Sequence, residues 1–485
     1  MNMSLIEIKK WRKMKKVIII FILAFLVRIL AVYITPIKLW DETVYANLGW
    51  DLKSNPLDYS FARKWSDYVP GDWPKAGYRA PLLPYTLAVL YSLTSSQTLI
   101  DLFIPFIGAI SVIFVYILAK NLFDKKIAFY SSIFLAFLPS HVIYSGKILT
   151  DVFSTFFLII SILFFWLGFE KGKNKYKLLF GFCFALSLLA RYTILWVFPI
   201  FPIYLILKCK NLSFLKDKFL WYSVAIFFFT LTPWFLYGIS EYNNPAGPFL
   251  HAQRAANYWG GMQPWYFYFQ YSTEIFSILF PLFVLSLAFL IISKEIGNRK
   301  VLFLLLWFLV FLIFATSMPH KEERFLLPIF PPVVILSSLL ANKFKIVLNV
   351  ALALMILHLI FSFNSTIIKS HTPVASCFLK ANEFITQLED NSVIVTDESP
   401  RVYFYTKKEN HFYPSPFDLS SLHFLADYYK GRPIYILWSA YDMPLEIPKN
   451  KIIKNILDNN FEIIYKCPED GSLAAIYSYY KKIST

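Results

Sequence analysis

The sequence has few glycines and cysteines and lacks the common nucleotide-binding motifs. Its 485 residues include 15 glycines, which argues against a channel whose helices pack through glycine. The four cysteines form no CxxC pair and show no Cys/His spacing typical of zinc ligands, so the sequence predicts no zinc site. Neither GxxxxGK[ST] nor a GxGxxG after a predicted strand is present, which argues against a nucleotide held by a phosphate loop.

Long apolar runs are the main feature of the chain. It is 57% hydrophobic, with a mean hydropathy of +0.52, whereas soluble domains are about 45–50% apolar. The net charge of +16 comes mostly from Lys and Arg in short loops between these runs. That is the positive-inside pattern, so the charge requires no nucleic acid partner. The sequence predicts a polytopic α-helical membrane protein of about 11–13 spans with a soluble C-terminal α/β domain.

The first apolar run, Val17–Ile37, follows a basic segment and ends without a small-residue cleavage site, which predicts an uncleaved signal anchor. Residues 1–363 are predicted to form the membrane module, with a long and therefore functional first outer loop over residues 38–81. Pro81–Leu93 is short enough to be interfacial or re-entrant. The further predicted spans are Leu102–Ala119, Ala128–Tyr144, Asp151–Phe169, Leu178–Leu207 as a hairpin, Phe219–Ile239, Ile275–Ile292, Val301–Ser317, Phe325–Leu340 and Ile346–Phe363.

The composition becomes more polar from about Asn364, and residues 364–485 are predicted to form an extracytoplasmic α/β domain with a mainly parallel sheet. It contains no Gly-rich phosphate loop, so a structural or acceptor-docking role is expected. Cys377 and Cys467 could pair in an oxidising compartment or remain free. The predicted strands are Ser392–Thr396, Pro433–Leu437, Phe461–Tyr465 and Leu473–Tyr477, and the predicted helices are Val374–Leu388, Leu419–Tyr429 and Asn450–Leu457.

Polar residues from distant stretches are predicted to lie on the face opposite the lysine-rich loops. They are Asp41 and Glu42, Lys147 and Asp151, Arg191, His251 and Arg254, and the run from His320 to Arg324. Ionisable groups collected at a membrane boundary suggest one site. Structural explanations stay open: Asp41 and Asp151 could cap helices, Arg191 could snorkel to the interface, and Lys321 and Arg324 could neutralise Glu322 and Glu323.

Carboxylates and cations near a membrane surface suit a reaction between an anionic lipid head group and a neutral acceptor. Cations would hold the lipid phosphate and stabilise charge on the leaving group. A carboxylate would take the proton from the attacking hydroxyl or amide. Transfer of a sugar from a polyprenyl phosphate meets these conditions without a nucleotide.

Five motifs follow one another along the chain. They are Asp41-Glu42 with Tyr45-Ala46, Tyr78-Arg79-Ala80-Pro81-Leu82, Thr150-Asp151, Gly181 to Ala190-Arg191, and His320-Lys321-Glu322-Glu323-Arg324-Phe325 with Pro331-Pro332. In order and spacing they resemble motifs of the GT-C superfamily of polyprenyl-phosphate-sugar glycosyltransferases, in particular dolichyl-phosphate-mannose protein mannosyltransferases and aminoarabinose transferases. The last motif is similar to the His-Lys-Glu-x-Arg-Phe segment of lipid-linked-oligosaccharide and GPI mannosyltransferases.

The resemblance implies transfer of one sugar, mannose or similar, from a polyprenyl or dolichyl phosphate to a lipid-linked glycan, protein or lipid with inversion. It implies that Asp41 is the base, with Glu42 as its neighbour or a substrate ligand and Asp151 as a second polar anchor. No cofactor is required, although a divalent metal stays open. The implied substrate and lipid-phosphate ligands are Arg79, Arg191, His320, Lys321, Arg324, Arg254 and Tyr45.

The chain departs from the resembled families at three motifs. Val44 stands where aminoarabinose transferases have Arg after Asp-Glu-Thr, and Ala80 stands where they have Lys before the loop-end Pro. Arg79 could supply the missing charge, and transfer of aminoarabinose to lipid A is doubtful. The Trp-Trp-Asp-Tyr-Gly motif of oligosaccharyltransferases is absent, which argues against transfer of a whole glycan to Asn.

Two other functions are kept as alternatives. A transporter or lipid flippase predicts ionisable residues near mid-membrane, and Arg28 inside the first span is the main such residue. A non-catalytic partner in glycan assembly predicts loss of the Asp-Glu motif, which is intact. For any of these functions the protein is expected in the cell membrane, or the ER of a eukaryote, with its site and C-terminal domain extracytoplasmic.

Overall fold

The computed structural model describes residues 5–60, 65–66, 76–258, 262–414, 417–441 and 443–479. It divides into two compact units. The helical unit comprises Met1–Tyr33, Gly77–Leu83 and Ser96–Asn364, and the mixed unit comprises Ile34–Ala76, Pro84–Ser95 and Ser365–Thr485. The sequence placed the whole first outer loop with the membrane module, whereas most of this loop clusters with the C-terminal domain.

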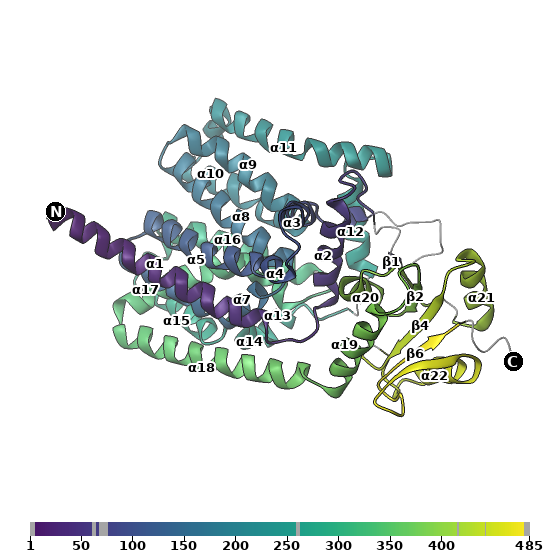
Figure 1. The fold of residues 1–485 in the computed structure, drawn as a ribbon. Helices are drawn as coiled ribbons and strands as arrows, with labels where there is room; N and C mark the ends of the chain where they lie inside the picture. The colour runs from purple at the N-terminus through teal and green to yellow at the C-terminus, as the bar shows by residue number, and fades with distance from the viewer. Residues whose placement is uncertain are drawn as a thin grey trace. The chain divides into compact units, whose positions relative to one another are not determined.

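The helical unit is built from long apolar helices joined by short connections (Figure 1). Its helix α8 packs between α5 and α9, and α9 also packs against α11. The helices are α1 (Leu5–Val32), α4 (Gln97–Asp101), α5 (Phe103–Leu122), α6 (Lys125–Phe137), α7 (Pro139–Ser145), α8 (Thr150–Phe165), α9 (Asn174–Ala190), α10 (Ile200–Cys209), α11 (Lys218–Tyr242), α12 (Gly247–Tyr258), α13 (Phe267–Gln270), α14 (Ser272–Phe276), α15 (Leu279–Ile292), α16 (Arg299–Ser317), α17 (Phe330–Lys343) and α18 (Lys345–Ser370).

The prediction of a polytopic helical membrane protein is confirmed. Among the described residues, seven helices are long and apolar enough to cross a membrane, or eight if a bent pair counts as one span. The sequence predicted about 11–13 spans, and fewer of the described helices than that are long and apolar enough to cross a membrane. Some predicted spans are short or broken helices: Leu279–Ile292 is apolar but has only 14 residues, and the pair α6–α7 bends by 60°.

The bend between α6 and α7 is where the buried charge of Arg28 is satisfied. Pro139 begins α7 and has no N–H to donate to the carbonyl of Leu135. The guanidinium of Arg28 donates to the carbonyls of Leu135 and Ala136, both at 3.1 Å, and to Ala24 at 2.8 Å. It also contacts Nδ1 of His141 at 2.8 Å. Arg28 therefore replaces the backbone hydrogen bonds that the bend removes.

The mixed unit has a six-stranded sheet with the order β1-β3-β2-β4-β6-β5 and helices on both faces. Because alternate strand residues point to opposite faces, Val393 and Val395 pack with α21 and α22, whereas Ile394 packs with α19 and α20. The elements are α2 (Trp40–Leu52), β1 (Trp65–Ser66), α3 (Leu82–Leu93), α19 (Pro373–Thr386), β2 (Val393–Thr396), α20 (Ser399–Thr406), β3 (Asn410–Phe412), α21 (Leu419–Tyr428), β4 (Ile434–Ser439), α22 (Pro448–Asn460), β5 (Glu462–Cys467) and β6 (Ala474–Ser478).

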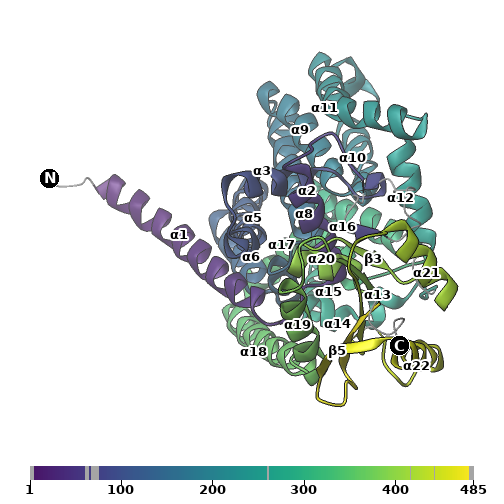
Figure 2. The ribbon, with the colours of Figure 1, turned by 45° about the vertical axis from the view of Figure 1, so that its right-hand side comes forward.

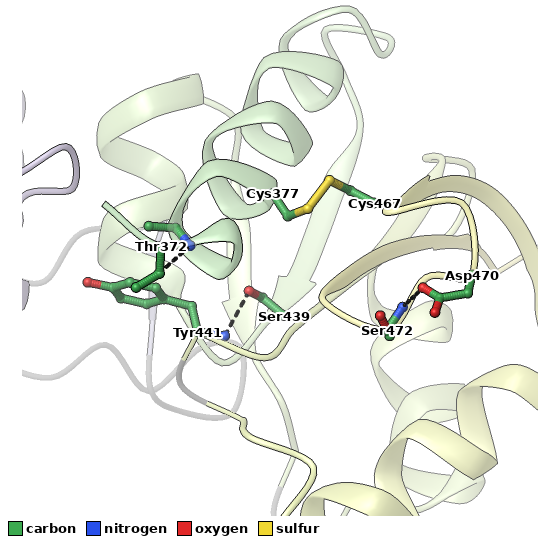
Figure 3. The surroundings of a disulfide bond; sticks show 8 residues. Thr372, Cys377, Ser439, Tyr441, Cys467, Asp470 and Ser472 are labelled. Atoms are coloured by element: carbon green, nitrogen blue, oxygen red, sulfur yellow. Dashed lines mark hydrogen bonds between the residues drawn. A yellow bond between two sulfur atoms is a disulfide. The ribbon is translucent and has the colours of Figure 1, made fainter. Parts of the chain in front are cut away.

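The predicted α/β domain is confirmed, but its sheet is mixed rather than mainly parallel. The pairings β1–β3, β3–β2 and β2–β4 are parallel, and β4–β6 and β6–β5 are antiparallel. The segment between β5 and β6 is too short for a parallel crossover, so these strands form a hairpin. Cys377 and Cys467, for which both states stayed open, form a disulfide that joins α19 to β5 (Figure 3).

Candidate functional site

A buried carboxylate, Asp151, joins two arginines from distant parts of the helical unit. It lies in the first turn of α8, where the helix dipole favours negative charge, and its side chain is 1% exposed. Oδ1 is 2.8 Å from Nη1 of Arg191, which ends α9, and Oδ2 is 3.9 Å from Nη1 of Arg324. Arg191 also donates to the hydroxyl of Thr150 at 3.1 Å. The structure thus brings together three residues predicted to share a site.

The second carboxylate at this cluster is Glu322. Its two oxygens accept from Nε and Nη2 of Arg324 at 2.6 and 2.8 Å. Nε2 of His320 lies 3.1 Å from Oε1 of the same carboxylate. Two arginines therefore face two carboxylates, so the charges of these four side chains sum to zero. The structural alternative that Arg324 neutralises Glu322 agrees with this pair, in which Glu322 accepts two hydrogen bonds from the guanidinium.

Phe325 provides an apolar surface beneath these cations. Its ring centroid is 4.7 Å from Cζ of Arg191 and 5.7 Å from Cζ of Arg324. The imidazole of His320 meets the same ring edge to face at 5.8 Å. Stacked guanidinium groups keep their planar edges free for hydrogen bonds, so Phe325 orients both arginines.

Lys321 lies apart from this ion-pair cluster, although the sequence predicted that it would help to hold the lipid phosphate. Its ammonium donates to the backbone carbonyls of Gln263 at 3.0 Å and Met318 at 2.5 Å, and the residue is 3% exposed. The backbone N–H of Lys321 donates to Oε1 of Gln263 at 2.6 Å. These bonds tie the loop that carries His320 and Arg324 to the segment before α13.

The end of the first outer loop reaches the same region through Tyr192. The hydroxyl of Tyr192, which directly follows Arg191, donates to the carbonyl of Gly77 at 2.9 Å and lies 3.4 Å from that of Arg79. The indole N–H of Trp234 donates to the Tyr192 hydroxyl at 2.8 Å. Half-buried Arg79 is thereby placed beside the loop of Arg191. Tyr192 was not predicted, and its only signal in the sequence is its position next to Arg191.

Three more residues of the helical unit were predicted to lie on the same face. His251 and Arg254 are on α12, and Lys147 lies between α7 and α8. His251 packs edge to face on Tyr78 at 5.4 Å, and its Nδ1 is 3.2 Å from the hydroxyl of Tyr242. Burial, with the charge of Arg254, lowers the pKa of His251 below its usual value. Arg254 itself is exposed, and Lys147 is buried in the segment between α7 and α8.

The Asp-Glu motif belongs to the mixed unit, in the first turn of α2. Asp41 is half-buried, while Glu42 is 1% exposed and accepts the N–H of Leu39 at 2.9 Å. Glu42 therefore caps the turn that carries Asp41. Tyr45, one turn later, is buried. Within the described ranges, no three His, Cys, Asp or Glu side chains are placed to hold a metal ion.

Comparisons with known proteins identify relatives in fold. A family profile described as dolichyl-phosphate-mannose-protein mannosyltransferase matches residues 78–237. No curated protein matches the sequence. ArnT from Cupriavidus metallidurans, solved bound to undecaprenyl phosphate, is similar over 97% of this chain and 99% of its own, with a TM-score of 0.71 and 12% identity.

A second solved structure has the same fold. The oligosaccharyltransferase from Archaeoglobus fulgidus, in its apo form, is similar over 94% of this chain and 73% of its own, with a TM-score of 0.64 and 14% identity. At such identities the likeness concerns the fold. The predicted GT-C-like fold is thereby confirmed.

Proposed function

We propose that the protein is an integral membrane glycosyltransferase that moves one sugar, mannose or similar, from a polyprenyl or dolichyl phosphate to an extracytoplasmic acceptor. The observation that carries the proposal is the pair Arg191 and Arg324, held by one buried carboxylate and stacked on one ring. Two oriented guanidinium forks are suited to a phosphate. The undecaprenyl phosphate bound to the ArnT structure, which has the same fold, supports this ligand class.

In the proposed reaction the acceptor oxygen or nitrogen attacks the anomeric carbon from the face opposite the phosphate. A bond from the acceptor atom to this carbon forms while the bond from the carbon to the phosphate oxygen breaks, which inverts the configuration. Polyprenyl phosphate leaves with the electron pair, and Arg191 and Arg324 stabilise the added negative charge. Asp41 takes the proton of the acceptor. The acceptor is a lipid-linked glycan, a protein or a lipid.

Binding of the lipid phosphate requires a change at Glu322. With its carboxylate on Arg324, the cluster carries no net positive charge to attract a phosphate. Glu322 is 35% exposed, so its carboxylate can turn into water, where hydration compensates for part of the lost ion pair. We propose that the phosphate replaces this carboxylate on Arg324, while buried Asp151 keeps both arginines in place.

The proposal is tested with membranes that contain wild type, Asp41→Asn or the control Asp427→Asn, which changes an exposed acid on α21. Each is incubated with radiolabelled polyprenyl-phosphate mannose, glucose or aminoarabinose, and label is followed into lipid, glycan and protein. We expect wild type and Asp427→Asn to transfer label and Asp41→Asn to transfer almost none. Equal transfer by Asp41→Asn would remove Asp41 as the base. No transfer by folded wild type from any donor would overturn the proposed function and favour a transporter or partner.

A further inference from the structure

Just before the Asp41 turn, both backbone polar groups of Lys38 are hydrogen-bonded to side chains of α20. The backbone N–H of Lys38 donates to the hydroxyl of Tyr405 at 2.9 Å. The carbonyl of Lys38 accepts from Nε of Arg401 at 3.1 Å. Tyr405 and Arg401 are both on α20, which lies beside α2 in both views (Figures 1 and 2). Two side chains of the C-terminal domain thus fix the backbone three residues before Asp41.

Arg401 is itself fixed by groups on several sides. Its Nη1 donates to Oε2 of Glu398 at 2.6 Å, and Glu398 is fully buried. Its Cζ lies 5.8 Å from the ring of Trp40 and 5.1 Å from that of Tyr441. Trp40, the residue before Asp41, also packs on Phe412 at 5.6 Å. A planar fork between aromatic faces is a geometry that Arg provides and Lys does not.

Further contacts hold the rest of α2 against the same helix. The side-chain amide of Asn47 donates to the carbonyl of Pro400 at 2.8 Å, and the hydroxyl of Tyr403 donates to Asp51 at 2.7 Å. Burial lowers the pKa of Arg401, and the carboxylate of Glu42 is one of the nearby groups that partly offset this shift. The contacts that join Arg401 to this turn are its hydrogen bond to the Lys38 carbonyl and its stacking on Trp40.

We propose that Arg401 and Tyr405 are positioning residues that fix the Asp41-Glu42 turn, so that the C-terminal domain is part of the catalytic apparatus. This inference rests on the proposed function of Asp41. A carboxylate that must take a proton at the moment of attack needs a defined place, and a displacement of about 1 Å can cost on the order of 100-fold in rate. Neither side chain needs to touch the substrate.

The experiment compares Tyr405→Phe and Arg401→Lys with the control Tyr435→Phe. Tyr405→Phe keeps the ring and removes only the hydroxyl that accepts from Lys38. Tyr435→Phe removes a hydroxyl of the same domain that donates to Glu389 at 2.7 Å. We expect kcat to fall about tenfold in the first two variants with the KM for the lipid-linked donor unchanged. The control should keep wild-type kcat, and Arg401→Gln should lose more activity than Arg401→Lys because it also loses the charge.

Hydrogen–deuterium exchange of the peptide that covers residues 38–43 gives a second readout. It should become faster in Tyr405→Phe and Arg401→Lys and stay unchanged in Tyr435→Phe. If wild type transfers sugar but both variants keep its kcat and exchange rate, the inference is overturned. If wild type transfers no sugar, the proposed function fails, while faster exchange would still support the ordering of this turn by Arg401 and Tyr405.

Discussion

At the scale of single residues, Glu322 gives a direct test of the proposed phosphate site, because its carboxylate occupies the guanidinium of Arg324. Glu322→Gln keeps the size of the side chain but removes its charge, which leaves the cluster with a net positive charge. We therefore expect polyprenyl phosphate to bind about 3–10-fold more tightly, which corresponds to roughly 1 kcal/mol. Binding is measured by titration calorimetry in detergent, with Glu295→Gln as the control at an exposed acid. Weaker binding would show that Glu322 orients Arg324 for the phosphate.

Asp151 has the opposite role, because it is the buried counter-charge of both arginines. Asp151→Asn leaves Arg191 and Arg324 without this charge, and breaking a buried pair typically costs about 3–5 kcal/mol. We expect a clearly lower thermal midpoint in detergent. The control is Glu409→Gln, whose side chain is 25% exposed and pairs with Arg432 at 29%, so its loss should cost at most about 1 kcal/mol. Equal midpoints for the two variants would contradict the structural role of Asp151.

The sequence predicted much of this cluster and missed its internal pairing. Asp151, Arg191 and Arg324 could be placed on one face because lysine-rich loops orient the spans. The order of charged residues in a sequence does not show which carboxylate forms an ion pair with a given arginine. The sequence predicted that Lys321 helps to hold the lipid phosphate, and it gave no sign that the ammonium donates to two backbone carbonyls.

At the scale of elements, the bend between α6 and α7 depends on Arg28. Arg28→Met would leave the carbonyls of Leu135 and Ala136 without their donor in an apolar surrounding, which costs several kcal/mol. Pro139→Ala in the same chain restores an N–H that can bond the Leu135 carbonyl. We expect Arg28→Met to lower the thermal midpoint and the double variant to recover part of the loss. No recovery would contradict this origin of the bend. An Arg28 used in transport would instead alter activity without a comparable loss of stability.

The contact between α9 and α11 requires a glycine. A Cβ at Gly181 would lie 2.1 Å from the backbone oxygen of Ser223, so the two helices touch without a side chain between them. Gly181→Ala should push them apart and cost about 1–3 kcal/mol, seen as a lower thermal midpoint. Gly297→Ala is the matched control because nothing lies within 4 Å of its added Cβ. The same midpoint for both variants would show that α11 can move away freely.

Elements with a strong pattern were predicted and short ones were not. The runs that became β2 and β4 are β-branched or aromatic and are buried on both faces, which gives a clear signal. β1 has two residues and β3 three, too few to show a period. α20 has eight residues, and its importance lies in contacts with α2, which is distant in sequence.

At the scale of the whole molecule, the division into units differs from the order of the chain. Most of the first outer loop clusters with residues from Ser365 onward because α2 packs on α20 and β1 pairs with β3. A composition change along the sequence marks only one of these boundaries. The boundary near Asn364 could therefore be predicted from the sequence. That Asp41 belongs to the mixed unit could not, because no change of composition marks it.

The cysteines can be used to test which side of the membrane each part of the chain faces. The disulfide between Cys377 and Cys467 is expected to form in an oxidising space, whereas Cys209 ends α10 between Lys208 and Lys210, on the side expected to be cytoplasmic. In intact cells we expect a membrane-impermeant maleimide to label Cys209 only after permeabilisation.

The same cells test the disulfide when their free thiols are blocked under denaturing conditions and the protein is then reduced. We expect two thiols per chain to appear after reduction, and none in Cys377→Ser. Four free thiols in wild type would place the mixed unit in a reducing compartment, and with it the Asp41 turn. An acceptor on the outer face would then be excluded. The placement of Asp41 on the oxidising side therefore depends on two results: a disulfide between Cys377 and Cys467, and protection of Cys209 from the maleimide in intact cells.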